Sequence, residues 1–595
     1  MCGIVGYKGE REENIGVVLL NCIRNLEYRG YDSIGMAVRN NSEILSKKGI
    51  GKIGEANAKL NFSNMKGNIG IAHTRWATNG NVTTLNSHPH HDINKNVYLV
   101  HNGIIENHQE LRTRLKKEGI ECISETDSEV IVQLIGMYLS SGISLIESVK
   151  KTLRELKGSY ALSVISKDSN DMIIARKDSP LVLGVGKYRG KLEYFVASDV
   201  PAFLSYCKKV VYLDDNEIGI ISDNSFEIYD LNANEKKHKE IVEIEWNIEQ
   251  AQKGEYEHFM LKEIFEQKET IKKAVLQDDK NFNDVINIMK NACGIFFVGC
   301  GTSYHAAVSA SYVFSHVAKK HVNVVLASEF RNYESFLTDK TVIVAISQSG
   351  ETADLLDAVK TAKNKGAKIV SIVNVMGSTL MRLSENTILM NAGPEICVLS
   401  TKSYTSQLAI LLQFAYGMVD KRLDAKEMVL SASNSGMKCI NSNKDNIKKI
   451  AEKIKDSHSM FLIGRDLAYP SALEGALKIK EVSYIHAEGF AGGELKHGTI
   501  ALIEKNVPCI VLVTDNTREM ILSNAAEIKT RGGYIIGIDS KNNDIYDDWI
   551  EIDEVGSADP ISMIMPIQIL SYYLALLRGC DPDKPRNLAK SVTVK

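Results

Sequence analysis

The second residue of the chain is a cysteine, one of only ten cysteines among 595 residues. If Met1 is removed, the thiol of Cys2 and a free α-amino group belong to the same residue. An α-amine has a pKa of roughly 7.7–8, so a useful fraction of it can accept the thiol proton near pH 7. Cys2 is therefore a candidate self-activated nucleophile, and a buried, idle thiol is the alternative interpretation.

Residues that could serve such a nucleophile occur within the first 130 positions. Attack on an amide needs donors for the oxyanion, and the segment VYLVHNG offers the side chain of Asn102 beside the backbone N–H of Gly103. Arg75, in AHTRWATNG, can form a forked contact to an α-carboxylate. Asp127, in SETDSE, can pair with an α-ammonium.

The second half of the chain contains three turns that are rich in hydroxyl groups. They carry Thr302 and Ser303; Ser347, Gln348, Ser349 and Thr352; and Ser400 and Lys402. Each turn places Ser or Thr at a helix N-terminus, where free N–H groups and the helix dipole favour a phosphate. Ordinary helix capping explains any single turn, but three turns on one rim favour a phosphate site. The chain has no GxxxxGK[ST] motif, so this is not a P-loop.

A group of ionisable residues follows nearer the C-terminus. Glu474, Lys478 and Glu481 are spaced by four and three residues, so they share one face of a helix. A solvated face with an ion pair is the alternative interpretation. The loop FAGGELKHG then brings His497, and the almost uncharged tail around Lys590 could dock. A carboxylate, a lysine and a histidine suffice to move protons on an open-chain sugar.

The elements that must position these residues change in character along the chain. The first third is rich in short apolar strands, such as NIGIAHTRW and NVYLVHNG, with a few helical segments between them. This pattern predicts layered sheets that are flanked by helices. From about residue 232 to 257 the chain becomes polar, which predicts a linker.

Beyond the linker, strand–turn–helix units predict a doubly wound parallel α/β sheet. The pattern occurs twice: Gly299 corresponds to Gly464 at an offset of 165 residues, and Ser347 corresponds to Thr514 at an offset of 167. A nearly constant offset predicts two tandem copies of one α/β domain. The expected divisions are a first domain 2–235, a linker 236–257, α/β domains 258–435 and 436–585, and a tail 586–595.

Composition excludes several classes of function. A net charge of −3 with scattered Lys and Arg predicts no nucleic-acid partner and no membrane-binding patch. Without a CxxC pair, the cysteines suggest neither a zinc site nor a disulfide framework, so we expect reduced thiols in the cytoplasm. We find no run of 18 apolar residues and no signal peptide, and therefore expect no membrane span. We expect no metal and no organic cofactor.

Five motifs relate the first domain to a known family. MCGIVGY, LEYRGYDSIGMA, HTRWAT, HNGIIENH and SETDSE resemble, in the same order, the N-terminal-nucleophile glutamine amidotransferase domain. The resemblance implies a four-layer αββα fold of the Ntn-hydrolase type. It implies that Cys2 is the nucleophile and that Asn102 and Gly103 stabilise the oxyanion. The implied glutamine-binding residues are Arg75, Thr78, Gly103 and Asp127.

The second half resembles tandem sugar-isomerase (SIS) domains. Its motifs are SQSGET, STKSYTSQ, ALEGALKIKE, YIHAE, GELKHG and the tail PRNLAKSVTV. With them, nearly the whole chain resembles the glutamine–fructose-6-phosphate aminotransferase (isomerizing) family. The implied sugar-phosphate-binding residues are Thr302, Ser303, Ser347, Gln348, Ser349, Thr352, Ser400 and Lys402.

The resemblance implies a complete reaction with glutamine and fructose 6-phosphate as substrates. Lys590 would form a Schiff base at C2 of the open-chain sugar, and His497 of a neighbouring subunit would open the ring, which implies a homodimer. Ammonia from glutamine would displace Lys590, and Glu481, assisted by Lys478, would move a proton between C1 and C2. The products are glucosamine 6-phosphate and glutamate, in the first step of hexosamine biosynthesis. Trp76 looks like the gate of an intramolecular ammonia channel.

Four positions depart from the family pattern. Asn79 stands where the family often has histidine, which puts that glutamine contact in doubt. Ser403 and Tyr404 replace an alanine–phenylalanine pair, and Leu399 is larger than usual. These three changes are expected to affect packing near the sugar.

Two other functions compete with this interpretation. Another glutamine amidotransferase, of the phosphoribosyl, asparagine synthase or glutamate synthase type, would need a pyrophosphate site, an ATP-binding loop, or flavin and iron–sulfur motifs. The sequence shows none of these, and its tandem repeat argues against all three types. A non-catalytic sugar-phosphate sensor built on SIS domains would not need Glu481, His497 and Lys590 together.

Overall fold

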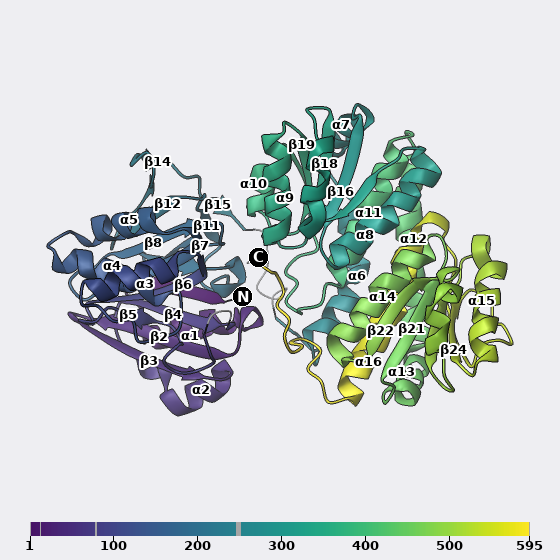
Figure 1. The fold of residues 1–595 in the computed structure, drawn as a ribbon, viewed down its shortest axis with the longest axis horizontal. Coiled ribbons are helices and arrows are strands. Elements are labelled where there is room, and N and C mark those ends of the chain that lie inside the picture. The colour runs from purple at the N-terminus through teal and green to yellow at the C-terminus, as the bar shows by residue number, and fades with distance from the viewer. Residues whose placement is uncertain (1, 12–13, 78–79, 245–251, 594–595) are drawn as a thin grey trace. The chain divides into compact units, whose positions relative to one another are not determined.

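The computed structural model describes residues 2–11, 14–77, 80–244 and 252–593. The chain forms two compact units. One contains residues 1–251 together with 591–595, and the other contains residues 252–590. Figure 1 shows the first unit from purple to blue and the second from teal to yellow.

Two antiparallel sheets form the centre of the first unit. The larger sheet contains, in spatial order, β15 (Val242–Glu243), β11 (Lys209–Tyr212), β9 (Val182–Tyr188), β10 (Lys191–Ala197), β1 (Gly3–Lys8), β4 (Ile69–Arg75), β2 (Ser33–Asn40) and β3 (Glu43–Ile50). The smaller sheet contains β14 (Lys236–Lys237), β13 (Phe226–Asp230), β12 (Glu217–Ile221), β8 (Met172–Lys177), β7 (Gly158–Ser166), β6 (Val97–Ile105) and β5 (His90–His91). An apolar core that includes Ile71, Val100 and Val196 packs strands of both sheets together.

Helices flank the two sheets. In the amino-acid order of the chain they are α1 (Ile15–Arg24), α2 (Ile53–Leu60), α3 (His108–Lys117), α4 (Glu129–Ser140) and α5 (Leu145–Glu155). Helix α1 packs on β1 and β4 of the larger sheet, while α4 packs on β5 and β6 of the smaller one. A second core, with Leu99, Leu134 and Val149, joins α4 and α5 to the smaller sheet. The result is the predicted αββα sandwich.

The expected linker begins later than its polar composition indicates. β14 pairs with β13, and β15 pairs with β11, so residues 236–243 extend the two sheets of the first unit. Backbone pairing at sheet edges tolerates polar side chains, because the strand needs only its N–H and C=O groups to pair.

The second unit contains two parallel five-stranded sheets with the same strand order. The first has β17 (Asn323–Leu326), β16 (Gly294–Gly299), β18 (Thr341–Ser347), β19 (Lys368–Val373) and β20 (Asn386–Leu389). The second has β22 (His486–Ala491), β21 (Ser459–Gly464), β23 (Pro508–Leu512), β24 (Tyr534–Asp539) and β25 (Asp548–Glu551). In both, the second strand of the chain lies at one edge and the other strands follow in order. This shared topology confirms the predicted repeat.

Helices pack around these two sheets. The longer ones are α6 (Phe259–Val275), α7 (Asp279–Lys290), α8 (Thr302–Val313), α9 (Ala353–Asn364), α11 (Lys402–Gly417), α12 (Arg422–Ser442), α13 (Lys444–Ile454), α14 (Ala468–Ser483), α15 (Arg518–Thr530) and α16 (Asp559–Leu577); α10 (Thr379–Leu383) is short. Helix α13 shows why the sequence folds this way: Ile447, Ile450, Ala451 and Ile454 recur at helical spacing and form its buried face.

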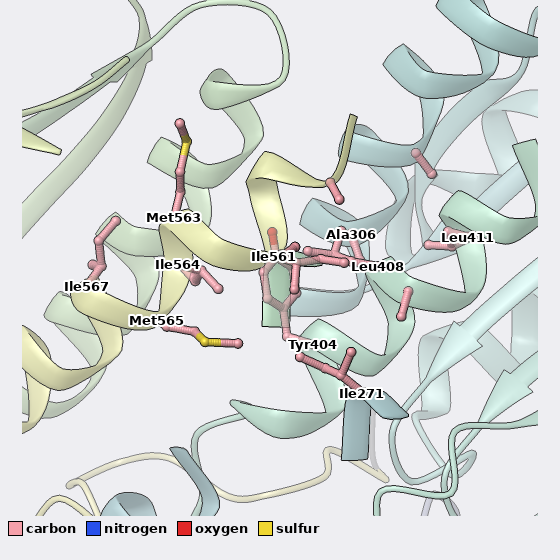
Figure 2. Packing of buried hydrophobic residues seen from close by; sticks show 14 of the residues in the cluster. Ile271, Ala306, Tyr404, Leu408, Leu411, Ile561, Met563, Ile564, Met565 and Ile567 are labelled. Atoms are coloured by element: carbon pink, nitrogen blue, oxygen red, sulfur yellow. The ribbon is translucent and has the colours of Figure 1, made fainter. Parts of the chain in front are cut away.

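Helix α16 is apolar on every side. Together with the turn before it, the helix covers Gly556–Leu577, a stretch long and apolar enough to cross a membrane by length and composition alone. In its most apolar 18 residues, 89% are buried inside the protein. Asp, Ser and Gln interrupt the stretch, so it is not an unbroken run of 18 apolar residues, and its burial is that of a core helix. Figure 2 shows Ile561, Ile564 and Met565 of this helix in one core with Tyr404 and Leu408 of α11.

Candidate active site

The thiol of Cys2 lies at the start of β1 and against the end of β4. The backbone N–H of Trp76 donates to Cys2 Sγ at 3.3 Å. Burial raises the pKa of the Cys2 thiol, although the N–H of Trp76 and the charge of Arg75 oppose this. The thiol is therefore mainly protonated at neutral pH and needs a base before it can attack.

Asn102 and Gly103 lie on β6 beside this cysteine. Asn102 Nδ2 donates to the carbonyl of Cys2 at 2.8 Å and to Ser198 Oγ at 3.0 Å. Gly103 has φ +130°, and a Cβ there would lie 2.1 Å from the Ser159 carbonyl oxygen, so only glycine fits. The side chain of Asn102 is thus fixed next to Cys2, and Gly103 follows it on β6. Because both Nδ2 hydrogens already have acceptors, an oxyanion must share or displace one of them.

The predicted glutamine-binding side chains are held by nearby loops. The guanidinium of Arg75 donates to the carbonyls of Asn81 and Gly80, both at 3.1 Å. Asp127 Oδ2 accepts a hydrogen bond from the Ile105 backbone N–H at 2.8 Å. Thr78 and Asn79 lie outside the described residues. The ring of Trp76, the predicted gate, packs edge-on against Tyr31, with ring centroids 5.6 Å apart.

The SQSGET turn connects β18 to α9, as the sequence predicts. Ser347 Oγ accepts a hydrogen bond from the Gly350 backbone N–H at 2.9 Å and lies 3.3 Å from Thr352 Oγ1. Ser349 Oγ accepts from the Glu351 backbone N–H at 3.2 Å. The backbone of Gln348 accepts from Asn374 N–H at 3.0 Å. The four predicted residues therefore form one ordered turn at a strand end.

Thr302 and Ser303 open α8 and join it to two other helices. Ser303 Oγ accepts from Gln407 Nε2 of α11 at 3.1 Å. Thr302 Oγ1 donates to Glu474 Oε1 and accepts from Lys478 Nζ of α14, both at 3.0 Å. The two SIS copies therefore meet at the N-terminus of α8.

Glu474, Lys478 and Glu481 form a buried ion cluster, so the solvated-face alternative is wrong for Glu474 and Lys478. Lys478 Nζ lies 3.3 Å from Glu474 Oε1 and 2.8 Å from Glu481 Oε2. Burial lowers the pKa of Lys478, but Glu474 and Glu481 outweigh it and raise that pKa overall. Lys478 is therefore a permanent cation that holds the Glu481 carboxylate. Periodicity alone does not reveal the burial, because it depends on the helices packed around α14.

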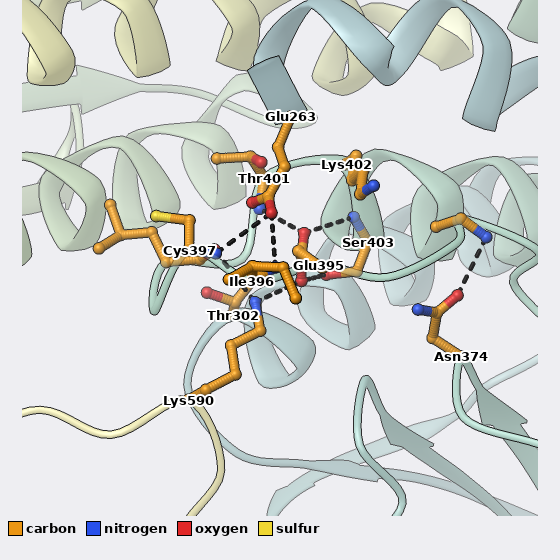
Figure 3. A network of polar contacts seen from close by, with 12 residues as sticks. Glu263, Thr302, Asn374, Glu395, Ile396, Cys397, Thr401, Lys402, Ser403 and Lys590 are labelled. Atoms are coloured by element: carbon orange, nitrogen blue, oxygen red, sulfur yellow. Dashed lines mark hydrogen bonds and ion pairs between the residues drawn. The ribbon is translucent and has the colours of Figure 1, made fainter. Parts of the chain in front are cut away.

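The tail docks Lys590 into a second buried network, shown in Figure 3. Lys590 Nζ donates to Glu395 Oε2 at 2.5 Å and to the Leu399 carbonyl at 3.2 Å. Burial raises the pKa of Glu395, but Lys590 and its hydrogen bonds hold that pKa below its ordinary value. The predicted docking of the tail is thus present, and Glu395, which sequence reasoning missed, is the partner of Lys590.

The predicted phosphate ligands Ser400 and Lys402 have different surroundings. Lys402 Nζ pairs with Glu266 Oε2 at 2.6 Å, and its side chain is buried. Ser400 is half-buried in the turn before α11. Lys402 thus faces a carboxylate of α6 in this structure, and a phosphate would compete with Glu266 for it.

His497 lies apart from both networks. It ends a 3-10 helix, Glu494–His497, and its side chain is exposed. Within the described part of the chain, no hydrogen bond or ion pair links His497 to Glu481 or Lys590. The structure brings together the other predicted proton-transfer residues of α14, but not this histidine.

Comparisons with known proteins match both halves of this arrangement. The Glutamine amidotransferase domain family matches residues 73–205, and the SIS domain family matches residues 288–416 and 453–577. Glutamine–fructose-6-phosphate aminotransferase (isomerizing) of Pyrococcus horikoshii is 46% identical to this chain, and that of Thermococcus kodakarensis is 43% identical; each match covers 100% of both chains. The chain belongs to the glutamine–fructose-6-phosphate aminotransferase (isomerizing) family.

A solved structure of a relative supports this family membership. The C-terminal domain of glucosamine-fructose-6-phosphate aminotransferase from Francisella tularensis is 34% identical, with a TM-score of 0.52. The match covers 56% of this chain and 99% of that one.

The family departures at positions 403 and 404 have distinct structural effects. Ser403 Oγ donates to Glu395 Oε2 at 2.8 Å, so the serine adds a hydrogen bond to the carboxylate that holds Lys590. Tyr404 is fully buried, and its hydroxyl has no hydrogen-bond partner among the described residues. Leu399 is buried and offers its carbonyl to Lys590. None of the three side chains removes Lys590 from its network.

Proposed function

We propose that this chain takes ammonia from L-glutamine at Cys2 and transfers it to D-fructose 6-phosphate, giving L-glutamate and D-glucosamine 6-phosphate. The family membership supports this reaction. The observation that carries the assignment of roles is the pairing of Lys590 with buried Glu395, because it places a lysine amine beside a carboxylate in a dry site.

In the glutaminase step, the α-amine exposed by removal of Met1 accepts the Cys2 proton. The thiolate attacks the amide carbon, and the negative charge on the carbonyl oxygen is stabilised by Asn102 Nδ2 and Gly103 N–H. Collapse breaks the C–N bond, and ammonia leaves with the proton from the α-ammonium. Water then cleaves the thioester to glutamate. Arg75, Thr78 and Asp127 hold the substrate's charged and polar groups.

In the synthase step, the hydroxyl-rich turns and Lys402 hold the sugar phosphate. The Lys590 amine adds to C2 of the open-chain ketose and water leaves, which gives a Schiff base. Ammonia replaces Lys590 at C2. Glu481 then removes a proton from C1 and returns one to C2, while the imine nitrogen gains a proton and the O1 hydroxyl loses one, so the ketimine becomes the amino aldose. Lys478 supports this step as a fixed cation that orients Glu481.

Two further parts of the proposal concern assembly and ammonia transfer. His497 of the partner subunit in a homodimer opens the sugar ring, which fits its exposure and its separation from Glu481 and Lys590 within one chain. Trp76, whose backbone contacts the nucleophile, gates the path of ammonia. The cytoplasm is the proposed location, since the ten cysteines are free thiols.

Lys590→Ala tests the synthase assignment. We expect glucosamine 6-phosphate formation to be lost while glutamate release from glutamine continues, because the Schiff base cannot form but Cys2 is unchanged. Lys480→Ala, an exposed lysine of α14, is the matched control and should retain both activities. Unchanged synthesis by Lys590→Ala refutes the mechanism.

Intact-protein mass spectrometry tests the glutaminase assignment. We expect active protein to begin at Cys2, because with Met1 attached the nitrogen of Cys2 is an amide that cannot accept a proton. Full glutamine-dependent activity of protein that retains Met1 would contradict the self-activated nucleophile.

A further inference from the structure

His73 lies on β4, one strand away from the nucleophile, and its side chain is 1% exposed. Its Nε2 lies 3.1 Å from Asn102 Oδ1 and 3.2 Å from the His101 carbonyl oxygen. The histidine therefore touches the side chain that is proposed to stabilise the oxyanion. The reaction scheme above gives His73 no role.

The hydrogen-bond pattern determines which nitrogen of His73 carries the proton. Asn102 Nδ2 donates to the Cys2 carbonyl and to Ser198 Oγ, so the amide oxygen of Asn102 faces His73. Both neighbours of His73 Nε2 are then acceptors, and Nε2 must carry a hydrogen. His73 Nδ1 is buried without a hydrogen-bond partner among the described residues and carries none.

The surroundings keep this imidazole neutral. Burial, together with the nearby charges of Arg75 and His101, lowers the pKa of His73 to about 3, although its contacts with Asn102 and the His101 carbonyl act in the opposite direction. The ring of His88 stacks against His73 with centroids 4.1 Å apart, and burial lowers the pKa of His88 as well. A neutral imidazole whose Nε2 carries the hydrogen can only donate from that nitrogen, over the whole pH range in which enzymes work.

An asparagine amide can turn by 180° at little cost unless its two ends have different partners. If the Asn102 amide turned, its oxygen would face the carbonyl oxygen of the bound glutamine amide and would repel the negative charge that develops there. A hydrogen-bond donor such as His73 Nε2–H at the Oδ1 end disfavours the turned orientation of the amide. The Cys2 carbonyl, which can only accept, also opposes the turn at the Nδ2 end, and His73 adds the matching constraint at the Oδ1 end. Ser198 Oγ does not discriminate, because a hydroxyl can donate as well as accept; it accepts from Ile4 N–H at 2.8 Å and can turn its own hydrogen.

We propose that His73 is a positioning residue, which fixes the Asn102 amide so that its N–H groups face the reacting carbonyl of glutamine. The proposal rests on the proposed oxyanion role of Asn102. It predicts an effect on the rate of the glutaminase reaction, and little effect on glutamine binding.

The test compares His73→Gln with His73→Asn. The glutamine side chain places an N–H near the position of Nε2, whereas asparagine carries the same amide one methylene shorter and cannot reach Asn102. With glutamate release measured at saturating fructose 6-phosphate, we expect His73→Gln to keep kcat within about threefold. We expect His73→Asn and His73→Leu to lose about 10–100-fold in kcat, less than the 10²–10³ of a deleted oxyanion donor. The KM for glutamine should stay within about twofold.

A double-mutant cycle separates positioning from general packing. If His73 acts through Asn102, then adding His73→Asn to Asn102→Ala should lower kcat no further. His88→Leu changes the same histidine stack without touching Asn102, and should keep kcat near that of the unmodified protein even if it lowers stability. Equal kcat losses in His73→Gln and His73→Asn, or additive losses in the double variant, overturn the proposal.

The same variants distinguish a failure of the oxyanion role of Asn102 from a failure of the positioning role of His73. If Asn102→Ala keeps normal kcat, the oxyanion assignment fails and the positioning proposal fails with it. If Asn102→Ala loses activity while His73→Asn and His73→Leu do not, only the positioning proposal is overturned.

Discussion

Two buried glutamates near Lys590 differ in protonation state. Glu395 accepts hydrogen bonds from Lys590 and Ser403, and these partners hold its pKa below its ordinary value despite burial. Burial raises the pKa of Glu263 to about 8, so that carboxyl is largely protonated at pH 7. It accepts hydrogen bonds from the backbone N–H groups of Ile396 and Cys397. The two glutamates therefore have different contacts: Glu395 pairs with Lys590, and Glu263 holds the backbone at residues 396 and 397.

This difference predicts unequal effects of the same substitution. Glu395→Gln should lower glucosamine 6-phosphate formation about 100-fold, because a neutral amide cannot form the buried ion pair that holds Lys590 in place. The Glu263→Gln variant should form glucosamine 6-phosphate at a rate within a few-fold of that of the unmodified protein, since an amide closely resembles a protonated carboxyl in shape. A coupled assay for the amino sugar, with glutamate release as the internal control, measures both. Equal losses would mean that charge at position 395 is not used.

At the scale of elements, the two SIS copies share a topology but differ in their strand-end turns. In the first copy, Ser347 ends β18 and its hydroxyl accepts a hydrogen bond within a hydroxyl-rich turn. In the second, Arg518 follows β23 and donates to both carboxylate oxygens of Asp539, at 2.6 and 2.7 Å. An internal ion pair thus occupies the second turn, which differs in this way from the hydroxyl-rich turn of the first copy.

Helix α16 begins with a carboxyl that is sensitive to pH. Asp559 accepts a hydrogen bond from the Val555 backbone N–H, but burial raises its pKa to about 7. In the unfolded chain the pKa is near 3.9. Between about pH 4 and 7 the folded state binds more protons, so this residue makes stability fall as pH rises through that window.

Asp559→Asn should therefore stabilise the protein more at pH 8 than at pH 5. The amide keeps the acceptor for Val555 and removes the buried charge, with a gain of about 1–3 kcal/mol at pH 8. Thermal unfolding at both pH values, for Asp559→Asn and the unmodified protein, measures the difference. The same difference in Tm at both pH values would show that Asp559 does not titrate as described.

At the scale of the whole molecule, the second unit has its own continuous core. Buried side chains from α6, α11, α14 and α16 belong to one cluster. The Francisella tularensis C-terminal domain corresponds to 56% of this chain. The core is therefore large enough for this unit to fold without the glutaminase unit.

A fragment of residues 252–595 should unfold cooperatively and bind fructose 6-phosphate. At a ligand concentration 100 times Kd, binding adds about 2.7 kcal/mol to stability, which raises Tm. Ser347→Ala should reduce this ligand-induced shift, because Ser347 shapes the phosphate turn. Thr514→Ala, the corresponding position of the second copy, is the control and should keep it. Equal shifts in both variants would place the phosphate elsewhere.

The sequence by itself determined the order of the parts and their chemistry. Strand periodicity, strand–helix alternation and the constant offset between Gly299 and Gly464 depend only on local spacing, so layered sheets with flanking helices and the tandem parallel sheets were predictable. The αββα order of the layers came from the resemblance of the motifs to a known family. Edge strands such as β14 and β15 were not, because polar edge strands lack apolar alternation. Motifs single out Cys2, Asn102 and Lys590, and the roles of these residues stay predictions.

Only the tertiary structure decided how those residues are charged and oriented. The burial of Glu474 and Lys478, the partner of Lys590 and the neutral state of His73 depend on segments far apart in the chain. Glu395 and Lys590 are 195 residues apart, and no local pattern connects them. Desolvation and pairing set pKa values and hydrogen-bond direction, and both arise only when the chain has folded.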